Sequence, residues 1–210
     1  MTKVKICGLS TPETMQAALD FGADMVGLVF YPRSPRNVSL EQAAPLAAQA
    51  RGKAKIVALV VDADDGLLKS IANAARPDYL QLHGSETPER VAEITKLFGV
   101  PVIKVIKVKE ASDVASAQSY KHVAELILFE AKAPEDLLPG GNGHSFDWNL
   151  LKGKDGQFML AGGLTADNVA EAIRLTRAPI VDVSSGVENL PGKKDISLIR
   201  KFIEQAKSAR

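Results

Sequence analysis

The segment IVALVV, residues 56–61, carries an apolar side chain at every position. The segment ELILF, residues 125–129, is apolar at each position after its glutamate. Successive side chains of a strand point to opposite faces, so an unbroken apolar run is typical of a strand covered on both faces. These two segments therefore favour an α/β fold, in which a parallel sheet is flanked by helices.

Comparable short runs recur along the whole chain, with turn residues or helical patterns between them. They are Val4–Cys7, Met25–Phe30, Lys55–Val61, Tyr79–Leu82, Val100–Val108, Glu125–Phe129, Phe158–Ala161 and Ile180–Val183. Their average spacing has room for a strand, a helix and two short loops. We therefore predict an α/β fold of the (β/α)8 (TIM) barrel type, with a single domain from Met1 to Arg210. The alternative, a doubly wound open sheet, is usually built from fewer strands.

Helix signals occupy the segments between the runs. Four segments open with residues that typically cap or begin a helix. These openings are Thr11-Pro12-Glu13, Ser85–Arg90, Thr165–Asn168 before a helix at Val169–Leu175, and Asp195 before a helix at Ile196–Ala206. Gly22 and Gly99 stand where two of the helices would end. The alternation of strand and helix is thus indicated by the caps as well as by the apolar runs.

The composition excludes several classes of protein. The chain has 46% hydrophobic and 24% charged residues and a net charge of +1, as an average globular protein has. The near-neutral charge and the 5% aromatic content disfavour a nucleic-acid partner. No segment approaches the roughly 20 apolar residues of a membrane span. The single cysteine and the lack of a signal-peptide pattern lead us to expect a cytoplasmic protein.

Chemically distinctive residues follow the predicted strands at the point where each strand ends. In a (β/α)8 barrel these ends share one rim, and that rim carries the active site. The residues in question are Cys7-Gly8, Arg36, Asp62, His83, Glu130, Gly162-Gly163, Asp182 and Ser185-Gly186. Their convergence predicts a small-molecule site at this rim.

Cys7 and Glu130 are the candidates for proton transfer. A thiol becomes a base or nucleophile as the thiolate, which needs a positive environment. The alternative for Cys7 is a small buried apolar residue. A half-buried carboxylic acid such as Glu130 suits general acid–base work. Its alternative is a structural ion pair with Lys132.

Arg36 and three residues of the last two loops are candidates for holding anionic groups. A guanidinium binds a carboxylate through two hydrogen bonds, although an arginine in the segment RSPRN could equally be a solvated loop residue. Gly163, Ser185 and Gly186 could offer backbone N–H groups to a phosphate, or could be turn residues only. The segment GVENLPGKKD, residues 186–195, could supply a short helix to that phosphate site. His83 and Asp182 are further candidates that could also be ordinary rim residues.

The sequence contains no metal-binding or nucleotide-binding motif. His83, His122 and His144 are scattered, and the patterns HxH, HExxH, CxxC, GxGxxG and the P-loop are absent. We therefore expect a site without metal or cofactor.

Several sequence blocks resemble the phosphoribosylanthranilate isomerase family of tryptophan biosynthesis. The blocks are KICGL (5–9), GLVFYPRSPRNV (27–38), LQLHG (80–84), PGGNGHSFDW (139–148), LAGGLTADNV (160–169) and VDVSSGVE (181–188). They occur in the family's order and span nearly the whole chain. The resemblance implies a (β/α)8 barrel that converts N-(5′-phosphoribosyl)anthranilate into 1-(2-carboxyphenylamino)-1-deoxyribulose 5-phosphate.

The resemblance also implies a role for each rim residue. Cys7 corresponds to the family's general base, and Arg36 to the arginine that binds the anthranilate carboxylate. His83 would lie beside the substrate, and Asp182 would bind the sugar hydroxyls. The phosphate would bind at Gly163, Ser185 and Gly186. The family's general acid is an aspartate where this chain has Glu130, which moves the carboxyl group by roughly 1.5 Å and is expected to slow the reaction.

Two other functions remain open at the level of sequence. The related isomerase of histidine biosynthesis uses two aspartates, and Cys7 counts against it. A barrel that binds a sugar phosphate without turning it over is the other alternative. The family includes monomers and homodimers, and the glycines of the loop from Lys132 to Ser145 suggest a lid over the substrate.

Overall fold

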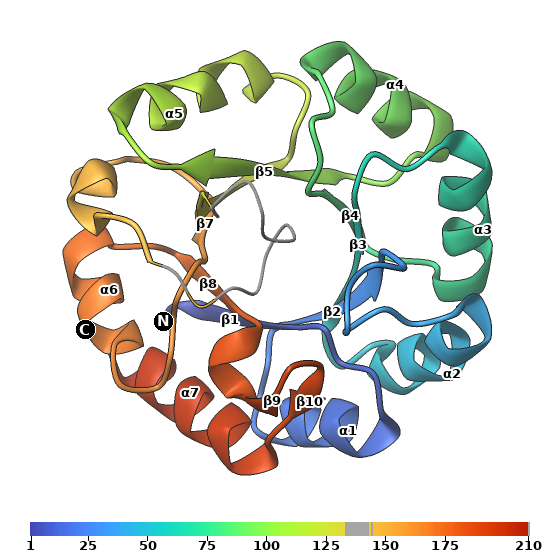
Figure 1. The fold of residues 1–210 in the computed structure, drawn as a ribbon, viewed down its shortest axis with the longest axis horizontal. Helices are drawn as coiled ribbons and strands as arrows, with labels where there is room; N and C mark the ends of the chain where they lie inside the picture. Colours follow the sequence, from blue (N-terminus) through green and yellow to red (C-terminus); the bar gives the residue numbers. More distant parts are fainter. Residues whose placement is uncertain (133–142, 144, 210) are drawn as a thin grey trace.

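Eight parallel strands close into a barrel in the computed structural model, which describes residues 1–132, 143 and 145–209. The strands are β1 (Lys3–Cys7), β2 (Met25–Phe30), β3 (Lys55–Val60), β4 (Tyr79–Leu82), β5 (Val102–Val108), β6 (Leu126–Ala131), β7 (Phe158–Leu160) and β8 (Ile180–Val183). Each strand pairs with the next in chain order, and β8 pairs with β1. The ring of strands lies inside a ring of helices (Figure 1). The predicted single-domain TIM barrel is confirmed, and the open-sheet alternative is wrong. Its extent from Met1 to Arg210 stays a prediction.

The strand boundaries differ from the prediction mainly at β6. This strand begins one residue later than expected and continues through Ala131, pairing along β5 up to Val108. Glu130 therefore lies within the last part of β6, in register with Lys107, and not beyond the strand's end. A residue inside a strand has its side-chain direction set by the pleat, so Glu130 is more firmly oriented than a loop residue.

The helices are α1 (Pro12–Asp20), α2 (Leu40–Ala50), α3 (Asp65–Ala75), α4 (Pro88–Phe98), α5 (Ala111–Ser116), α6 (Val169–Thr176) and α7 (Ile196–Ser208). Thr11, Thr87 and Asp195 cap α1, α4 and α7 as predicted, each accepting a hydrogen bond from a first-turn amide. Between β6 and β7 the described residues form only a 3-10 helix, Trp148–Leu151. No helix in the described part of the chain is long and apolar enough to cross a membrane.

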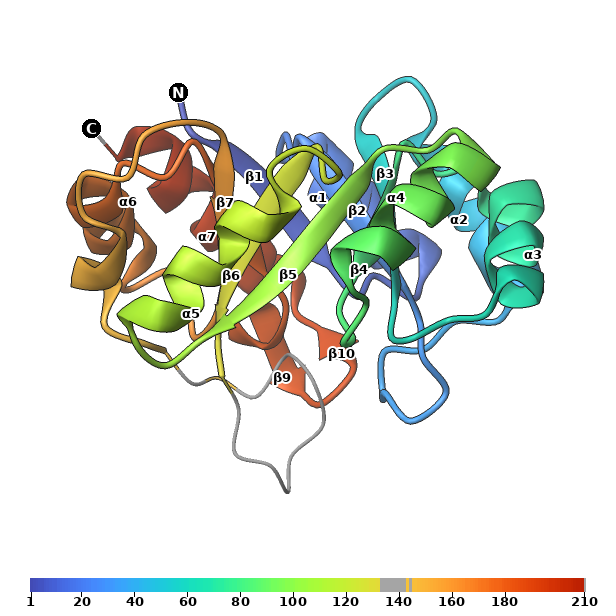
Figure 2. The same cartoon turned by 90° about the horizontal axis from the view of Figure 1, so that it is seen from above.

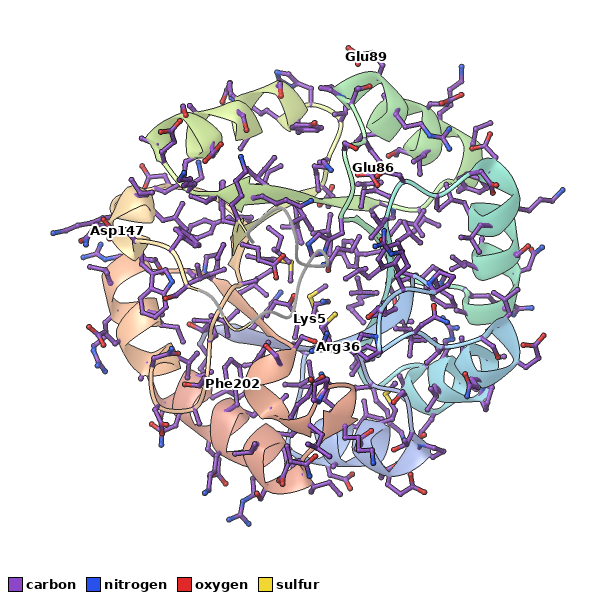
Figure 3. All side chains as sticks on the ribbon, in the orientation of Figure 1. Lys5, Arg36, Glu86, Glu89, Asp147 and Phe202 are labelled. Carbon is purple, nitrogen blue, oxygen red and sulfur yellow. The ribbon has the colours of Figure 1, made fainter. Side chains whose placement is uncertain are left out.

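Apolar residues fill both the space around the barrel and most of its interior. Phe202 of α7 is fully buried against the outer face of the barrel (Figure 3). A second cluster, which includes Met25, Val57 and Met159, fills the inside of the ring. Lys5 is also fully buried inside this ring (Figure 3). The interior therefore changes from apolar to charged towards the carboxyl ends of the strands.

The segment after β8 forms a hairpin rather than the expected short helix. A three-residue 3-10 turn (Ser185–Val187) leads into β9 (Glu188–Leu190), which pairs antiparallel with β10 (Lys193–Lys194). Gly192 turns the hairpin at φ 79°, and a Cβ there would lie 2.5 Å from the carbonyl oxygen of Pro35. The hairpin thus packs against the loop after β2, and it lies at the end of the barrel opposite the N-terminus (Figure 2).

Candidate active site

A cavity opens at the carboxyl ends of the strands, with about 470 Å³ of free space when the open solvent at its mouth is counted. Its walls include all five residues predicted for catalysis and substrate binding. These are Cys7, Arg36, His83, Glu130 and Asp182. The other residues of the wall are Val29, Tyr31, Ser34, Leu59, Val61, Gln81, Leu128 and Ser184. Strands β1, β4, β6 and β8 and the loop after β2 each contribute to one site, as the convergence of the sequence positions predicted.

Lys5 and Asp182 form a buried ion pair at the base of the cavity. The two residues are in register on β1 and β8, and Lys5 Nζ lies 3.0 Å from Asp182 Oδ1. Burial by itself would lower the pKa of Lys5, but the charges and hydrogen bonds of Asp182 and Cys7 raise it overall. Burial also raises the pKa of Asp182, against which the charge of Lys5 acts. The raised pKa of Lys5 favours its charged form, whereas the raised pKa of Asp182 favours its neutral form. The 3.0 Å contact supports the charged pair, because each ion then has its counter-ion beside it in the interior.

Cys7 lies beside this pair and is itself only 3% exposed. Burial raises the pKa of its thiol, and the positive charge of Lys5 is the largest influence in the other direction. The thiol is therefore more protonated at neutral pH than an ordinary cysteine, and its thiolate depends on neighbouring cations.

Glu130 reaches across the cavity to His83. Glu130 Oε2 lies 2.7 Å from His83 Nε2, with 14% and 4% of the respective side chains exposed. The contact is close, but neither imidazole nitrogen makes a hydrogen bond with good geometry to a described residue. His83 is thus placed to affect proton transfer to and from Glu130. The sequence suggested Lys132, and not His83, as the neighbour of this carboxyl group.

Arg36 is clamped by Glu188 of the hairpin. Arg36 Nε and Nη2 donate to Glu188 Oε1 and Oε2 over 2.7 and 2.8 Å, and the arginine is 8% exposed. The alternative of a solvated loop arginine is therefore wrong. A two-point contact fixes the plane of the guanidinium, and Figure 3 shows Arg36 near the centre of the barrel.

The clamp continues through Lys194 towards Cys7. Lys194 Nζ donates to Glu188 Oε1 over 2.6 Å and to the Ser184 carbonyl over 3.0 Å. Ser184 Oγ in turn donates to the carbonyl oxygen of Cys7. Burial lowers the pKa of Lys194 and the charge of Glu188 opposes this, whereas Arg36 and Lys194 hold the pKa of Glu188 below its usual range despite burial. We take Lys194 as the ammonium, because oxygen acceptors surround its Nζ.

Glu188 and Lys194 were missed by the sequence analysis. Glu188 lies 152 positions from Arg36 in the chain, and no local pattern links the two. Lys5 was missed as well, although a lysine between apolar residues in a buried strand is an unusual signal. Glu188 and Lys194, by contrast, are recognised only when the strands are assembled.

The Glu188→Gln variant is expected to lose on the order of 3–5 kcal/mol of unfolding free energy, because it leaves two buried cations without their counter-charge. Chemical denaturation measures this loss. Glu93→Gln is the matched control, since its pair with Arg90 is exposed and is expected to contribute little. The native pKa of Glu188 lies below its usual 4.5, so its contribution is present above that pH and is lost as the pH falls through the native value. Equal stability of Glu188→Gln and the wild type at pH 7 would contradict a stabilising role for the contacts of Glu188 with Arg36 and Lys194.

The loops that follow β3 and β4 are tied together by a buried ion pair outside the ring of strands (Figure 3). Lys104 Nζ lies 2.7 Å from Glu86 Oε2 and donates to the carbonyl of Gly84 over 2.9 Å. Glu86 Oε1 accepts from the amides of Asp62 and Gly84. This buried ion pair fixes the segment that follows His83, which is a further reason for the defined position of the imidazole.

The predicted phosphate-binding residues lie on two loops that touch. A Cβ at Gly186 would lie 1.9 Å from the carbonyl oxygen of Leu164, so the loops after β7 and β8 meet where only glycine fits. Gly163 has φ 64°, and its carbonyl accepts from Asn168 Nδ2. No oxygen in the described part of the chain accepts a hydrogen bond from the amides of Gly163, Ser185 or Gly186. The assignment of phosphate to these amides stays a prediction.

Two predictions about the site, the absence of a metal or cofactor and the presence of a lid, stay predictions. Within residues 1–132, 143 and 145–209, no group of three His, Cys, Asp or Glu residues could hold a metal ion. The expectation of a site without metal or cofactor stays a prediction. The lid expected between Lys132 and Ser145 falls almost entirely outside the described residues.

A (β/α)8 barrel whose rim cavity is lined by a thiol and a carboxylic acid has groups suited to proton transfer, as an aldose–ketose isomerase requires. Residues 4–205 match the family model described as "N-(5'phosphoribosyl)anthranilate (PRA) isomerase". The chain belongs to this family of isomerases, which acts in tryptophan biosynthesis.

Individual relatives agree over nearly the full length. The N-(5'-phosphoribosyl)anthranilate isomerase of Bradyrhizobium sp. (strain ORS 278) is 54% identical over 209 residues, covering 98% of this chain and 95% of that protein. The enzyme of Rhizobium meliloti (strain 1021) is 52% identical, covering 99% and 98%. The crystal structure of the Thermotoga maritima isomerase superposes with a TM-score of 0.88 at 36% identity, covering 99% of each chain. A phosphoribosyl anthranilate isomerase in complex with reduced 1-(o-carboxyphenylamino)-1-deoxyribulose 5-phosphate gives 0.86 at 34%, again covering 99% of each chain.

Proposed function

We propose that this chain isomerises N-(5′-phosphoribosyl)anthranilate to 1-(2-carboxyphenylamino)-1-deoxyribulose 5-phosphate, with Cys7 and Glu130 as the acid–base pair. The observation that carries the proposal is the placement of both groups on the wall of one cavity, on strands β1 and β6. The similar isomerase that was solved with a reduced product bound supports the same ligand class.

The rearrangement needs one proton delivered and one removed. Glu130 protonates the furanose ring oxygen, the bond from that oxygen to C1′ breaks, and a Schiff base forms with the anthranilate nitrogen. The Cys7 thiolate then takes the proton from C2′, and the electron pair moves to give an enolamine. Tautomerisation of the enolamine yields the ketone, so atoms and electrons balance without an external reductant or oxidant. The expected absence of a cofactor is consistent with this sequence of steps.

The remaining residues of the cavity orient the substrate. Arg36, held in plane by Glu188, binds the anthranilate carboxylate, since a guanidinium has further N–H donors besides the two that Glu188 accepts. Asp182 binds the sugar hydroxyls while it anchors Lys5. His83 lies beside the acid, 2.7 Å from Glu130, where it can exchange a hydrogen bond with it during the reaction. The phosphate binds to the amides of Gly163, Ser185 and Gly186.

The two other functions are less well supported. The histidine-pathway isomerase would use two aspartates, whereas the base position on β1 is Cys7. The only support for a barrel that binds its ligand without turnover is Glu130, which stands where the family resemblance implies an aspartate. The added methylene is expected to make the reaction slow rather than to abolish it, since the carboxylic acid is retained.

The partner is a small molecule, and the chain acts as a monomer or a homodimer. A Thermotoga maritima relative is described as a dimeric enzyme from which monomers have been generated, which supports both states for this fold. A cytoplasmic location, without nucleic-acid or membrane partners, stays a prediction from the composition.

The decay of the substrate's anthranilate fluorescence on addition of the purified protein tests the proposed reaction. We expect a protein-dependent decay that continues over many turnovers, and no turnover of the corresponding aminoaldose of histidine biosynthesis. Binding of a product analogue by calorimetry, without any fluorescence decay over roughly two pH units on either side of the usual thiol pKa of about 8.5, would favour the ligand-binding barrel. Comparable turnover of both substrates would favour the histidine-pathway alternative.

A further inference from the structure

Lys5 is the buried charge whose purpose the proposed reaction does not explain. Its side chain has no exposed surface, and it lies two residues before Cys7 on the inward face of β1. Burying an ammonium group costs several kcal/mol unless counter-charges offset the loss of hydration. An apolar residue would fill this position at lower cost, so a lysine here points to a use for its charge.

The neighbouring strand leaves room for the thiol and the ammonium to come together. Gly27 on β2 is paired with Cys7, and a Cβ on this glycine would lie 2.9 Å from Cys7 Sγ and 3.2 Å from Lys5 Nζ. Because both atoms lie so near one point, they are no more than about 6 Å apart, well inside the range of a strong charge interaction in a dry interior. Any larger residue at position 27 would push them away.

We propose that Lys5 is a positioning residue that stabilises the thiolate form of Cys7 against the cost of its burial, and that Asp182 holds the ammonium beside the thiol. Lys5 does not touch the substrate and acts through Cys7. The inference rests on the proposed function, in which Cys7 is the base, and it adds the group that makes this base available.

The charged groups around Cys7 shift the equilibrium between its thiol and thiolate forms. Lys5, Lys194 and Arg36 favour the thiolate from β1, β10 and the loop after β2, and His83 does so when protonated. Asp182 on β8 and Glu130 on β6 oppose it, as does burial. Lys5 opposes the effect of burial more strongly than any other neighbour. The pKa of Lys5 is raised despite burial, chiefly by the charge of Asp182, which favours the ammonium form.

The single cysteine makes a direct test possible. The ultraviolet absorbance of the thiolate, followed as a function of pH, reports on Cys7 alone once the signal of the three tyrosines is subtracted. The Cys7→Ser variant supplies that baseline. The variants to compare with the wild type are Lys5→Met, which keeps the length of the side chain without its charge, and Lys5→Arg, which keeps the charge.

We expect Lys5→Met to raise the midpoint of the thiol titration by roughly one unit or more, and Lys5→Arg to restore a large part of the shift. The alkaline rise of kcat/KM should move by the same amount. A Lys5→Met midpoint at the wild-type pH would overturn the inference. If circular dichroism shows that Lys5→Met does not fold, Lys5→Gln, which is neutral but can still donate a hydrogen bond to Asp182, decides: a raised midpoint supports the inference, and a midpoint at the wild-type pH overturns it.

The titration needs no substrate, so it separates this inference from the proposed function. A midpoint that depends on Lys5, in a protein whose Cys7→Ala variant keeps full activity, would mean that the proposed base is wrong. An inactive Cys7→Ala variant together with a titration that ignores Lys5 would leave the proposed reaction standing and this inference refuted.

Discussion

Replacing Cys7 with alanine is expected to lower kcat for the isomerisation by on the order of 10²–10⁴-fold, the usual contribution of a general base. KM should change little, because the thiol faces one proton of the substrate and binds neither its carboxylate nor its phosphate. Cys7→Ser is expected to be almost as slow, since a hydroxyl in the same place yields far too little alkoxide at neutral pH. Steady-state kinetics by anthranilate fluorescence measures both variants.

The pH dependence sharpens this prediction. The pKa of Cys7 lies above its ordinary value because burial outweighs the nearby cations. The thiolate fraction, and with it kcat/KM, should therefore rise with pH on the alkaline side, and this rise should disappear in Cys7→Ala. Full activity in Cys7→Ala, with product-analogue affinity unchanged, would show that another group removes the C2′ proton.

Replacing Glu130 with glutamine is expected to lower kcat by a similar factor, on the order of 10²–10⁴-fold, because an amide cannot protonate the ring oxygen. The contact with His83 over 2.7 Å fixes the side chain, so a glutamine of the same shape should preserve the cavity. Glu125→Gln is the matched control. It lies next to the start of the same strand and lines a depression at the opposite end of the barrel, so it should leave the rate unchanged.

Glu130→Asp tests the length of the acid. Shortening the side chain by one methylene gives the aspartate that the family resemblance implies here and is expected to raise kcat, by up to about 100-fold if the present carboxyl group is misplaced by about 1 Å. A slower aspartate variant would mean that the contact of Glu130 with His83 already places the acid correctly. Glu130→Gln with wild-type activity would remove this residue from the mechanism.

The sequence alone determined the fold and much of the site. The buried strands are continuous apolar runs, and the helix caps at Thr11, Thr87 and Asp195 are local hydrogen-bonding patterns. Such features depend on residues close together in the chain, so periodicity and residue type suffice to predict them. The rim residues followed from the same local signals, because a (β/α)8 barrel brings all its strand ends to one face. Their roles came from the family resemblance.

Other features needed the assembled barrel. The short helix expected in segment 186–195 is replaced by a hairpin: Pro191 and Gly192 disfavour a helix and favour a turn, and Gly192 packs against Pro35 of a distant loop. Glu130 belongs to β6 because pairing with β5 extends the strand beyond its apolar run.

The electrostatics of the site were decided entirely by tertiary structure. Glu188 meets Arg36, and Lys5 meets Asp182, only when β8 and the hairpin close against β1 and the loop after β2. The energy of a charge depends on its burial and on its neighbours in space, and neither is encoded in the residues next to it in the chain. The sequence thus predicts which groups react, while the closed barrel decides the burial and the neighbouring charges that set their protonation.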